Sequence, residues 1–134
     1  MSPELYWLML TVLMTAFLWL PYILDRVVVR GALPALLDRK AETGHPHSEW
    51  AKRAIRAHEN AVENLIIFAP AVLAAHMLGV STELTQTAVV VYFFARLAHY
   101  AIYVSGAPFF RTIAFVAGWA AQIAVILAVL GAGS

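Results

Sequence analysis

Four long apolar stretches divide this chain and limit its fold more than any other feature of the sequence. They cover residues 5–24, 65–78, 84–104 and 109–130. A helix of about 20 apolar residues crosses the hydrocarbon core of a bilayer, and segments rich in turn residues separate the stretches. We predict a single all-α domain over residues 1–134, an integral membrane four-helix bundle. Its helices are expected near residues 4–30, 48–78, 83–104 and 108–131.

The composition agrees with a membrane setting. Hydrophobic residues make up 62% of the 134 residues and charged residues 13%, with a mean hydropathy of +0.75, unlike an average soluble domain. The chain has no cysteine, so any thiol chemistry needs a thiol from a cosubstrate. Four short helices enclose little interior, which favours association with further copies of the chain. The net charge of +1 gives no reason to expect a nucleic-acid partner.

The distribution of basic residues predicts how the helices cross the membrane. Most of the nine Lys and Arg residues lie between Asp25 and Arg56, whereas residues 79–87 and the C-terminal tail have none. Cytoplasmic loops are enriched in Lys and Arg, so we place the first loop in the cytoplasm and both termini on the opposite side. Pro21 should kink the first helix, and Ser48 is the expected N-cap of the second.

A polar segment interrupts the apolar character of the second helix. Its polar residues are Arg53, Arg56, His58, Glu59, Asn60 and Glu63. Ionisable groups at helix centres in lipid cost roughly 2.5 to 3.5 kcal/mol each, so such a cluster indicates a functional site. At 100° per residue, about an 80° arc of one helix face holds Arg53, Arg56, Asn60 and Glu63. By the same geometry, His58 points away from this arc and Glu59 flanks it.

Two further stripes follow the same helical spacing. About a 60° arc of the third helix holds Tyr92, Arg96, His99 and Tyr103. One line along the fourth helix holds Arg111, Phe115, Gly118 and Gln122. The three stripes can converge on one pocket, in which guanidinium groups suit carboxylates and Glu63 suits an ammonium group. The predicted ligand is therefore small, zwitterionic and rich in carboxylates.

These stripes resemble the motifs of a known family. The signature of the MAPEG family, the membrane-associated proteins in eicosanoid and glutathione metabolism, is similar to the run of Arg53, Arg56, Ala57, His58, Asn60 and Glu63 followed by Phe68 and Pro70. The spacing of Arg96, His99 and Tyr103 resembles a motif of the family's third helix. A motif of its fourth helix is similar to the set Pro108, Arg111, Thr112, Gly118 and Gln122. The resemblance covers essentially the whole chain.

The resemblance implies a homotrimer that holds glutathione, as cosubstrate, between neighbouring subunits. The residues that would bind the tripeptide are Arg56, Asn60, Glu63, His99 and Tyr103. Arg26 or Arg30 would supply a cation from the first helix, and we add Arg53 and Arg96 because they lie on the same stripes. As the catalytic pair, Arg111 would stabilise the thiolate and Thr112 would offer a hydroxyl to the sulfur.

The implied function is that of a membrane-bound glutathione-dependent transferase or peroxidase. It would activate the thiol for attack on a lipophilic electrophile or hydroperoxide that arrives through the bilayer. Glu59 and Phe115 depart from the characterised members, which leaves a different low-molecular-weight thiol open. Two other classes also stay open: a non-catalytic lipid-binding or scaffold protein of the same fold, and a small transporter component.

Several polar residues of the stripes also have simpler structural explanations. Glu63 could form an interhelical ion pair with Arg56 or Arg96, since buried charges need partners with or without a ligand. Asn60 could join two helices by a hydrogen bond. His99 could be a buried, hydrogen-bonded histidine without a chemical role.

Basic and imidazole groups near the first loop have explanations of the same kind. Arg39, Lys40 and Arg53 are expected to anchor the chain at the cytoplasmic membrane interface. His45 and His47 lie in the loop without carboxylate or thiol neighbours, which makes a poor metal site. We therefore predict no metal.

Overall fold

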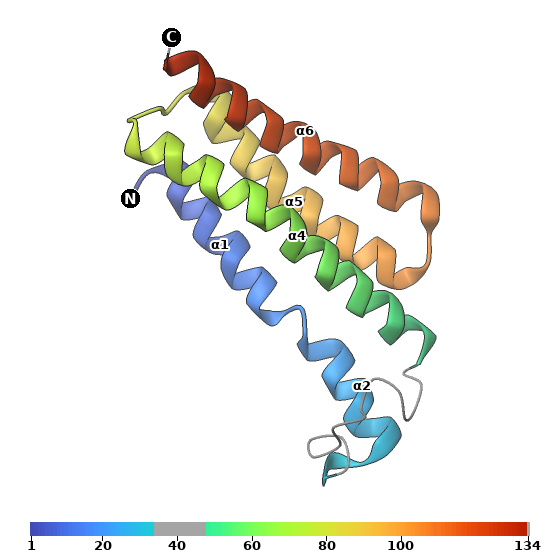
Figure 1. The fold of residues 1–134 in the computed structure, drawn as a ribbon. Helices are drawn as coiled ribbons and strands as arrows, with labels where there is room; N and C mark the ends of the chain where they lie inside the picture. The colour runs from blue at the N-terminus through green and yellow to red at the C-terminus, as the bar shows by residue number, and fades with distance from the viewer. Residues whose placement is uncertain (34–47, 134) are drawn as a thin grey trace.

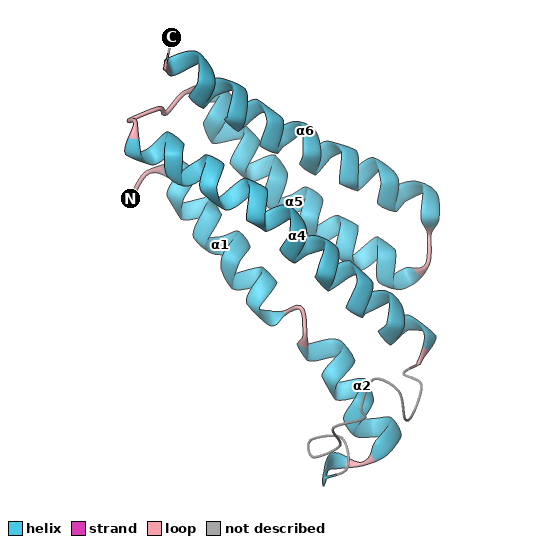
Figure 2. Ribbon diagram, in the orientation of Figure 1, coloured by secondary structure: helices cyan, strands magenta, loops and turns pink. Residues whose placement is uncertain are grey.

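The computed structural model describes residues 1–33 and 48–133, and their regular structure is entirely helical (Figure 2). The helices are α1 (Pro3–Phe17), α2 (Leu20–Arg30), α4 (Glu49–Met77), α5 (Glu83–Ser105) and α6 (Pro108–Ala132). Residues Pro3–Val29 and each of α4, α5 and α6 are long and apolar enough to cross a membrane. The predicted all-α fold with four membrane-length helical segments is confirmed.

The long helices run side by side, and α2 extends from the bundle along the first part of α4 (Figure 1). Helix α5 packs against α1, α4 and α6. Both termini lie at one end of the bundle, and the α5–α6 turn lies at the other, where α4 begins (Figure 1). The homotrimer and the side of the membrane that each end faces stay predictions.

The first membrane segment is two helices rather than the single kinked helix expected from Pro21. Helix α1 ends at Phe17, and the backbone N–H of Leu18 donates to the Thr15 carbonyl at 3.2 Å. Proline has no N–H for the carbonyl four residues earlier, here that of Phe17, and its ring crowds the same carbonyl. The chain therefore breaks one turn before Pro21, which then lies in the first turn of α2.

The start of α4 is fastened to α2. Ser48 occupies the N-cap position as expected, but its hydroxyl makes no capping bond to its own helix. Instead it donates to Asp25 Oδ1 at 2.6 Å, and its backbone N–H donates to Asp25 Oδ2 at 3.1 Å. Because Asp25 is buried, its carboxylate needs these donors. One side chain thereby joins two helices.

Packing in the middle of the bundle is apolar, and a polar contact closes the end that holds the termini. The rings of Phe68 and Tyr92 stack at 3.6 Å between centroids and 6° between planes, which joins α4 to α5. At the terminal end, the Thr85 hydroxyl donates to buried Glu4 Oε1 at 2.6 Å, and the Ser81 hydroxyl donates to Oε2 at 3.2 Å. These contacts fix α1 against α5.

Some of the predictions from sequence concern residues that cannot be compared with the structure. Those for Arg39, Lys40, His45 and His47 lie outside the described residues. Arg30 ends α2, but its side chain is likewise outside the described part.

Candidate functional site

A tight turn between α5 and α6 builds the end of the bundle that carries most of the polar residues. Gly106 has φ +87° and donates its N–H to the carbonyls of Ile102 and Tyr103, at 3.2 and 3.1 Å. The Arg53 side chain of α4 covers this turn, because its Nε donates to the Val104 carbonyl at 2.9 Å. Arg53 therefore serves the C-terminal end of α5, whose last carbonyls favour a cation.

Beyond this turn, the polar stripes of α5 and α6 face each other step by step. The guanidinium carbon of Arg111 lies 4.5 Å from the centroid of the Tyr103 ring, a cation–π contact. One turn further into the bundle, the rings of His99 and Phe115 are 6.1 Å apart. The next pair is Arg96 and Gly118, where a Cβ added to the glycine would lie 3.4 Å from Arg96 Cδ.

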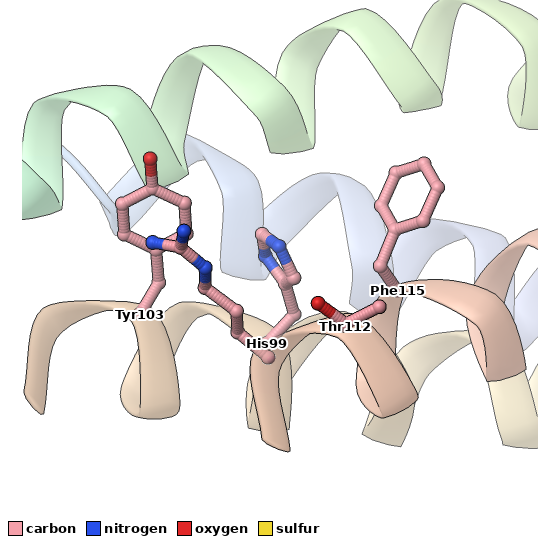
Figure 3. Close-up of a pocket in the computed structure, with 5 residues that line it drawn as sticks. His99, Tyr103, Thr112 and Phe115 are labelled. Atoms are coloured by element: carbon pink, nitrogen blue, oxygen red, sulfur yellow. The ribbon is translucent and has the colours of Figure 1, made fainter. Parts of the chain in front are cut away.

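An open pocket of about 180 Å³ lies between these two stripes. Its lining residues are His99, Tyr103, Arg111, Thr112 and Phe115. The side chains of His99, Tyr103 and Phe115 project to the same side of the two helices (Figure 3). Four residues that the sequence analysis assigned to the site, both predicted catalytic residues among them, thus meet within one chain.

The polar atoms of this pocket differ in what they can still bind. The Thr112 hydroxyl donates to the Pro108 carbonyl of its own helix at 3.2 Å, so its hydrogen is already engaged. His99 is only 4% exposed, and its Nδ1 has no hydrogen-bond partner among the described residues. Buried polar atoms are nearly always paired, and His99 is therefore a candidate for contact with a ligand or water.

The stripe on α4 is divided rather than gathered at this pocket. Asn60 Oδ1 accepts a hydrogen bond from Arg96 Nη2 at 2.6 Å, which joins α4 to α5. Glu63 is exposed and lines a second pocket, of about 390 Å³. Among the described residues Glu63 has no ion pair with Arg56 or Arg96; the ion pair on α4 joins Lys52 to Glu49 at 2.9 Å.

The second pocket contains residues that the sequence analysis placed off the main stripe. Its lining residues are Tyr22, His58, Glu59, Val62 and Glu63. Tyr22 Oη and His58 Nδ1 are 2.8 Å apart and share a hydrogen bond between α2 and α4. The sequence analysis missed Tyr22 because its side chain faces α4 only as a result of the break between α1 and α2. Tyr22 lies four residues before Arg26, a predicted site residue, and therefore on the same helix face; this spacing could have identified it.

The remaining predicted cations line neither pocket. Arg56 is exposed, and Arg26 is partly buried with its Nε unpaired among the described residues. Within the same residues, no group of three or more His, Asp or Glu side chains is placed to hold a metal ion.

The electrostatics of the first pocket favour an anion. Arg111 lines the pocket, Arg96 lies one turn from His99 on the same face of α5, and neither forms an ion pair in the described part of the chain. Cationic groups in surroundings of low dielectric constant attract negative charge more strongly than they do in water. The pocket therefore suits a carboxylate or a thiolate better than a neutral group.

An integral-membrane helical bundle with a cationic pocket at one end is the class of protein that the fold and this site define. The sequence matches the family model of the MAPEG family over residues 5–131, nearly its whole length, and the chain belongs to that family. The resemblance drawn from the motifs is confirmed. No curated protein and no solved structure matched the chain.

Proposed function

We propose that this chain is a membrane-bound, glutathione-dependent transferase or peroxidase. Membership of a family that includes glutathione transferases and peroxidases supports this class of activity. The single observation that carries the proposal is the position of Arg111 in the pocket, beside Tyr103 and one turn from His99. A guanidinium at this position can hold the sulfur of a bound thiol as an anion.

Thiolate stabilisation is the chemical step that the pocket can supply. A thiol with a pKa of about 8.5 is only about 3% ionised at pH 7, and the thiolate is the nucleophile. A cation within about 4–6 Å favours the ionised form. Arg111 then serves as the catalytic cation, while His99 and Tyr103 bind polar groups of the peptide.

Two outcomes of thiolate attack are consistent with this site. In conjugation, the sulfur forms a bond to an electrophilic carbon of the lipophilic substrate, and the leaving group departs with the electron pair. In peroxide reduction, the sulfur attacks the terminal oxygen of a hydroperoxide, and the O–O bond breaks. The alkoxide takes a proton to become an alcohol. A second glutathione then reduces the sulfenic acid, which gives glutathione disulfide and water.

The size of the pocket bears on how a tripeptide would bind. Pockets for drug-sized ligands usually measure about 300–1,000 Å³, whereas this one measures about 180 Å³. One chain can therefore enclose the thiol-bearing part of glutathione but not all of it. The proposed homotrimer resolves this, because exposed Arg56 and Glu63 can complete the site across a subunit interface.

A titration with glutathione tests the proposal directly. Reduced glutathione is added to the purified, detergent-solubilised protein, and thermal stabilisation and ultraviolet thiolate absorbance are recorded. The control ligand has oxygen in place of sulfur. We expect both ligands to stabilise the protein and only glutathione to give the thiolate signal.

The other outcomes separate the alternatives. Stabilisation without a thiolate signal would favour a binding or scaffold protein that keeps the fold but lacks thiol activation. If millimolar glutathione gives neither thermal stabilisation nor a thiolate signal, the proposal is wrong for this thiol. Other low-molecular-weight thiols are then tested in the same assay.

A further inference from the structure

Arg96 is the most deeply buried charged side chain near the pocket, yet it does not line it. It is 2% exposed, and its Nη2 donates to Asn60 Oδ1 at 2.6 Å. On its other side, Arg96 Cδ lies 3.4 Å from the position that a Cβ on Gly118 would occupy. The Arg96 stem thus packs against α6 at Gly118, and this packing helps to hold the guanidinium in place.

The chemistry of the two side chains determines which way the Asn60 amide faces. An arginine has five N–H donors and no acceptor, whereas an asparagine amide has an acceptor at one corner and two donors at the other. Only the oxygen of Asn60 can therefore face Arg96. Asn64 adds a second donor on the same side. Its Nδ2 donates to the backbone carbonyl oxygen of Asn60 at 2.8 Å and lies 3.4 Å from Asn60 Oδ1.

The other corner of the Asn60 amide remains available. Asn60 Nδ2 donates to no group among the described residues, and the side chain is only partly buried. With its oxygen engaged by Arg96 and Asn64, Asn60 presents two N–H donors to whatever lies beside α4. Such donors select a hydrogen-bond acceptor, namely a carboxylate or a peptide carbonyl oxygen.

We propose that Arg96 is a positioning residue, which sets the orientation of the Asn60 amide so that its N–H donors face an acceptor group of the bound thiol peptide. This inference rests on the proposed function and deepens it. It moves Arg96 from the ligand-binding set expected from the sequence to a supporting role one contact behind the ligand. It also gives a reason for a guanidinium at this depth, where a charged group is costly.

A simpler explanation competes with this one. The Arg96–Asn60 bond could serve only to join α4 to α5. The substitution Asn60→Asp separates the two explanations, because a carboxylate accepts from Arg96 at least as well as an amide but has no N–H donors. A purely structural contact survives this change, whereas a donor to the ligand is lost and replaced by a negative charge.

The experiment measures the glutathione Kd by calorimetry and the thermal midpoint in detergent. The variants are Asn60→Asp, Asn60→Ala, Arg96→Met, Arg96→Lys and the double variant Arg96→Met/Asn60→Ala. We expect Asn60→Asp to keep the wild-type midpoint within a few degrees and to bind glutathione roughly 10- to 100-fold more weakly, the effect of one lost hydrogen bond to a charged group. Arg96→Met should weaken binding to a similar degree.

Two comparisons test that Arg96 acts through Asn60. The double variant should bind no more weakly than Asn60→Ala alone, because residues that act through one contact have non-additive effects. Arg96→Lys should restore part of the affinity, since an ammonium group is also only a donor. Val89→Ala, a change at a fully buried residue of the same helix, controls for general destabilisation and should lower the midpoint without changing Kd.

The results that overturn the inference are specific. Wild-type affinity in Asn60→Asp, or additive penalties in the double variant, would show that Arg96 does not position a ligand donor. If Arg96→Met does not fold, Asn60→Asp decides alone. If the wild-type protein fails to bind glutathione, the proposed function and this inference are both refuted. If the wild-type protein binds glutathione and the variants bind it equally well, only the inference is refuted.

Discussion

Replacing Arg111 with alanine should remove most of the thiol activation while leaving much of the thiol binding. Arg111 lies in the first turn of α6 and lines the pocket, 4.5 Å from the Tyr103 ring centroid. A thiolate about 4 Å from a guanidinium gains about 4 kcal/mol at an effective dielectric constant of about 20, equivalent to about three pKa units. Because Arg111 is only partly buried, solvent screens this attraction, and we expect it to lower the thiol pKa by about one to two units.

This decrease determines the size of the effect and its dependence on pH. A thiol with a pKa of about 6.5–7.5 is about 24–76% ionised at pH 7, compared with about 3% at a pKa of about 8.5. Arg111→Ala should therefore lower turnover at pH 7 by about 8- to 25-fold. At pH 9 the unassisted thiol is itself about 76% ionised, so the deficit should shrink to less than about twofold.

The assay follows conjugation of glutathione to an apolar electrophile by the purified protein across this pH range, with Kd measured in parallel. Arg111→Lys is the matched control, because it keeps the charge but not the planar fork of donors, and it should retain part of the rate. A deficit of equal size at pH 7 and pH 9, or one explained wholly by weaker binding, would refute thiol activation by Arg111.

Three further substitutions test contacts that hold the helices together, each by its effect on the thermal midpoint in detergent. Glu4→Ala removes the hydrogen bond from the Thr85 hydroxyl to Glu4; because this hydroxyl can still donate to the Thr82 carbonyl at 3.0 Å, the change should cost about 0.5–1.5 kcal/mol of stability, and an unchanged midpoint would contradict that contact. Gly106→Ala places a side chain at φ +87°, a strain of about 1–3 kcal/mol, and a stability equal to wild type would show that the turn relaxes. Tyr22→Phe removes the hydrogen bond to His58 and should cost about 0.5–1.5 kcal/mol, whereas a gain in stability would count against it.

The sequence was sufficient for the three later membrane helices, though not for the break in the first, and for the faces that α5 and α6 present. Helical period alone fixes which residues of one helix share a side, and the short turn at Gly106 leaves the two helices antiparallel and adjacent. The cation–π pair of Tyr103 with Arg111 and the contact of His99 with Phe115 follow from that adjacency. The family resemblance rested partly on these residues, and the match to the family model confirms it.

The sequence could not give the rotation of α4 against its neighbours. Period places Asn60 and Glu63 on one arc, but the structure directs the first toward Arg96 and the second toward the pocket beside Tyr22. An arc of about 80° is wide enough to face two neighbouring helices at once. The bond between Asp25 and Ser48 was equally hidden, because it joins residues separated by the first loop.

Arg96 also gives a prediction about stability whose sign is opposite to that of most core substitutions. Its guanidinium is 2% exposed, its Nε has no partner in the described residues, and it forms no ion pair there. Replacing a buried ion pair with apolar side chains of similar volume is often neutral or stabilises a protein by about 1–4 kcal/mol, and Arg96 has no ion-pair partner among the described residues whose attraction would be lost. The single hydrogen bond to Asn60 offsets only about 1.5–3 kcal/mol of that burial cost. The substitution Arg96→Met should therefore keep or raise the thermal midpoint of the ligand-free protein and should weaken glutathione binding. This combination is expected of a residue that is retained for function at a cost in stability. A fall in the midpoint as large as that of Val89→Ala would instead show that Arg96 holds the bundle together.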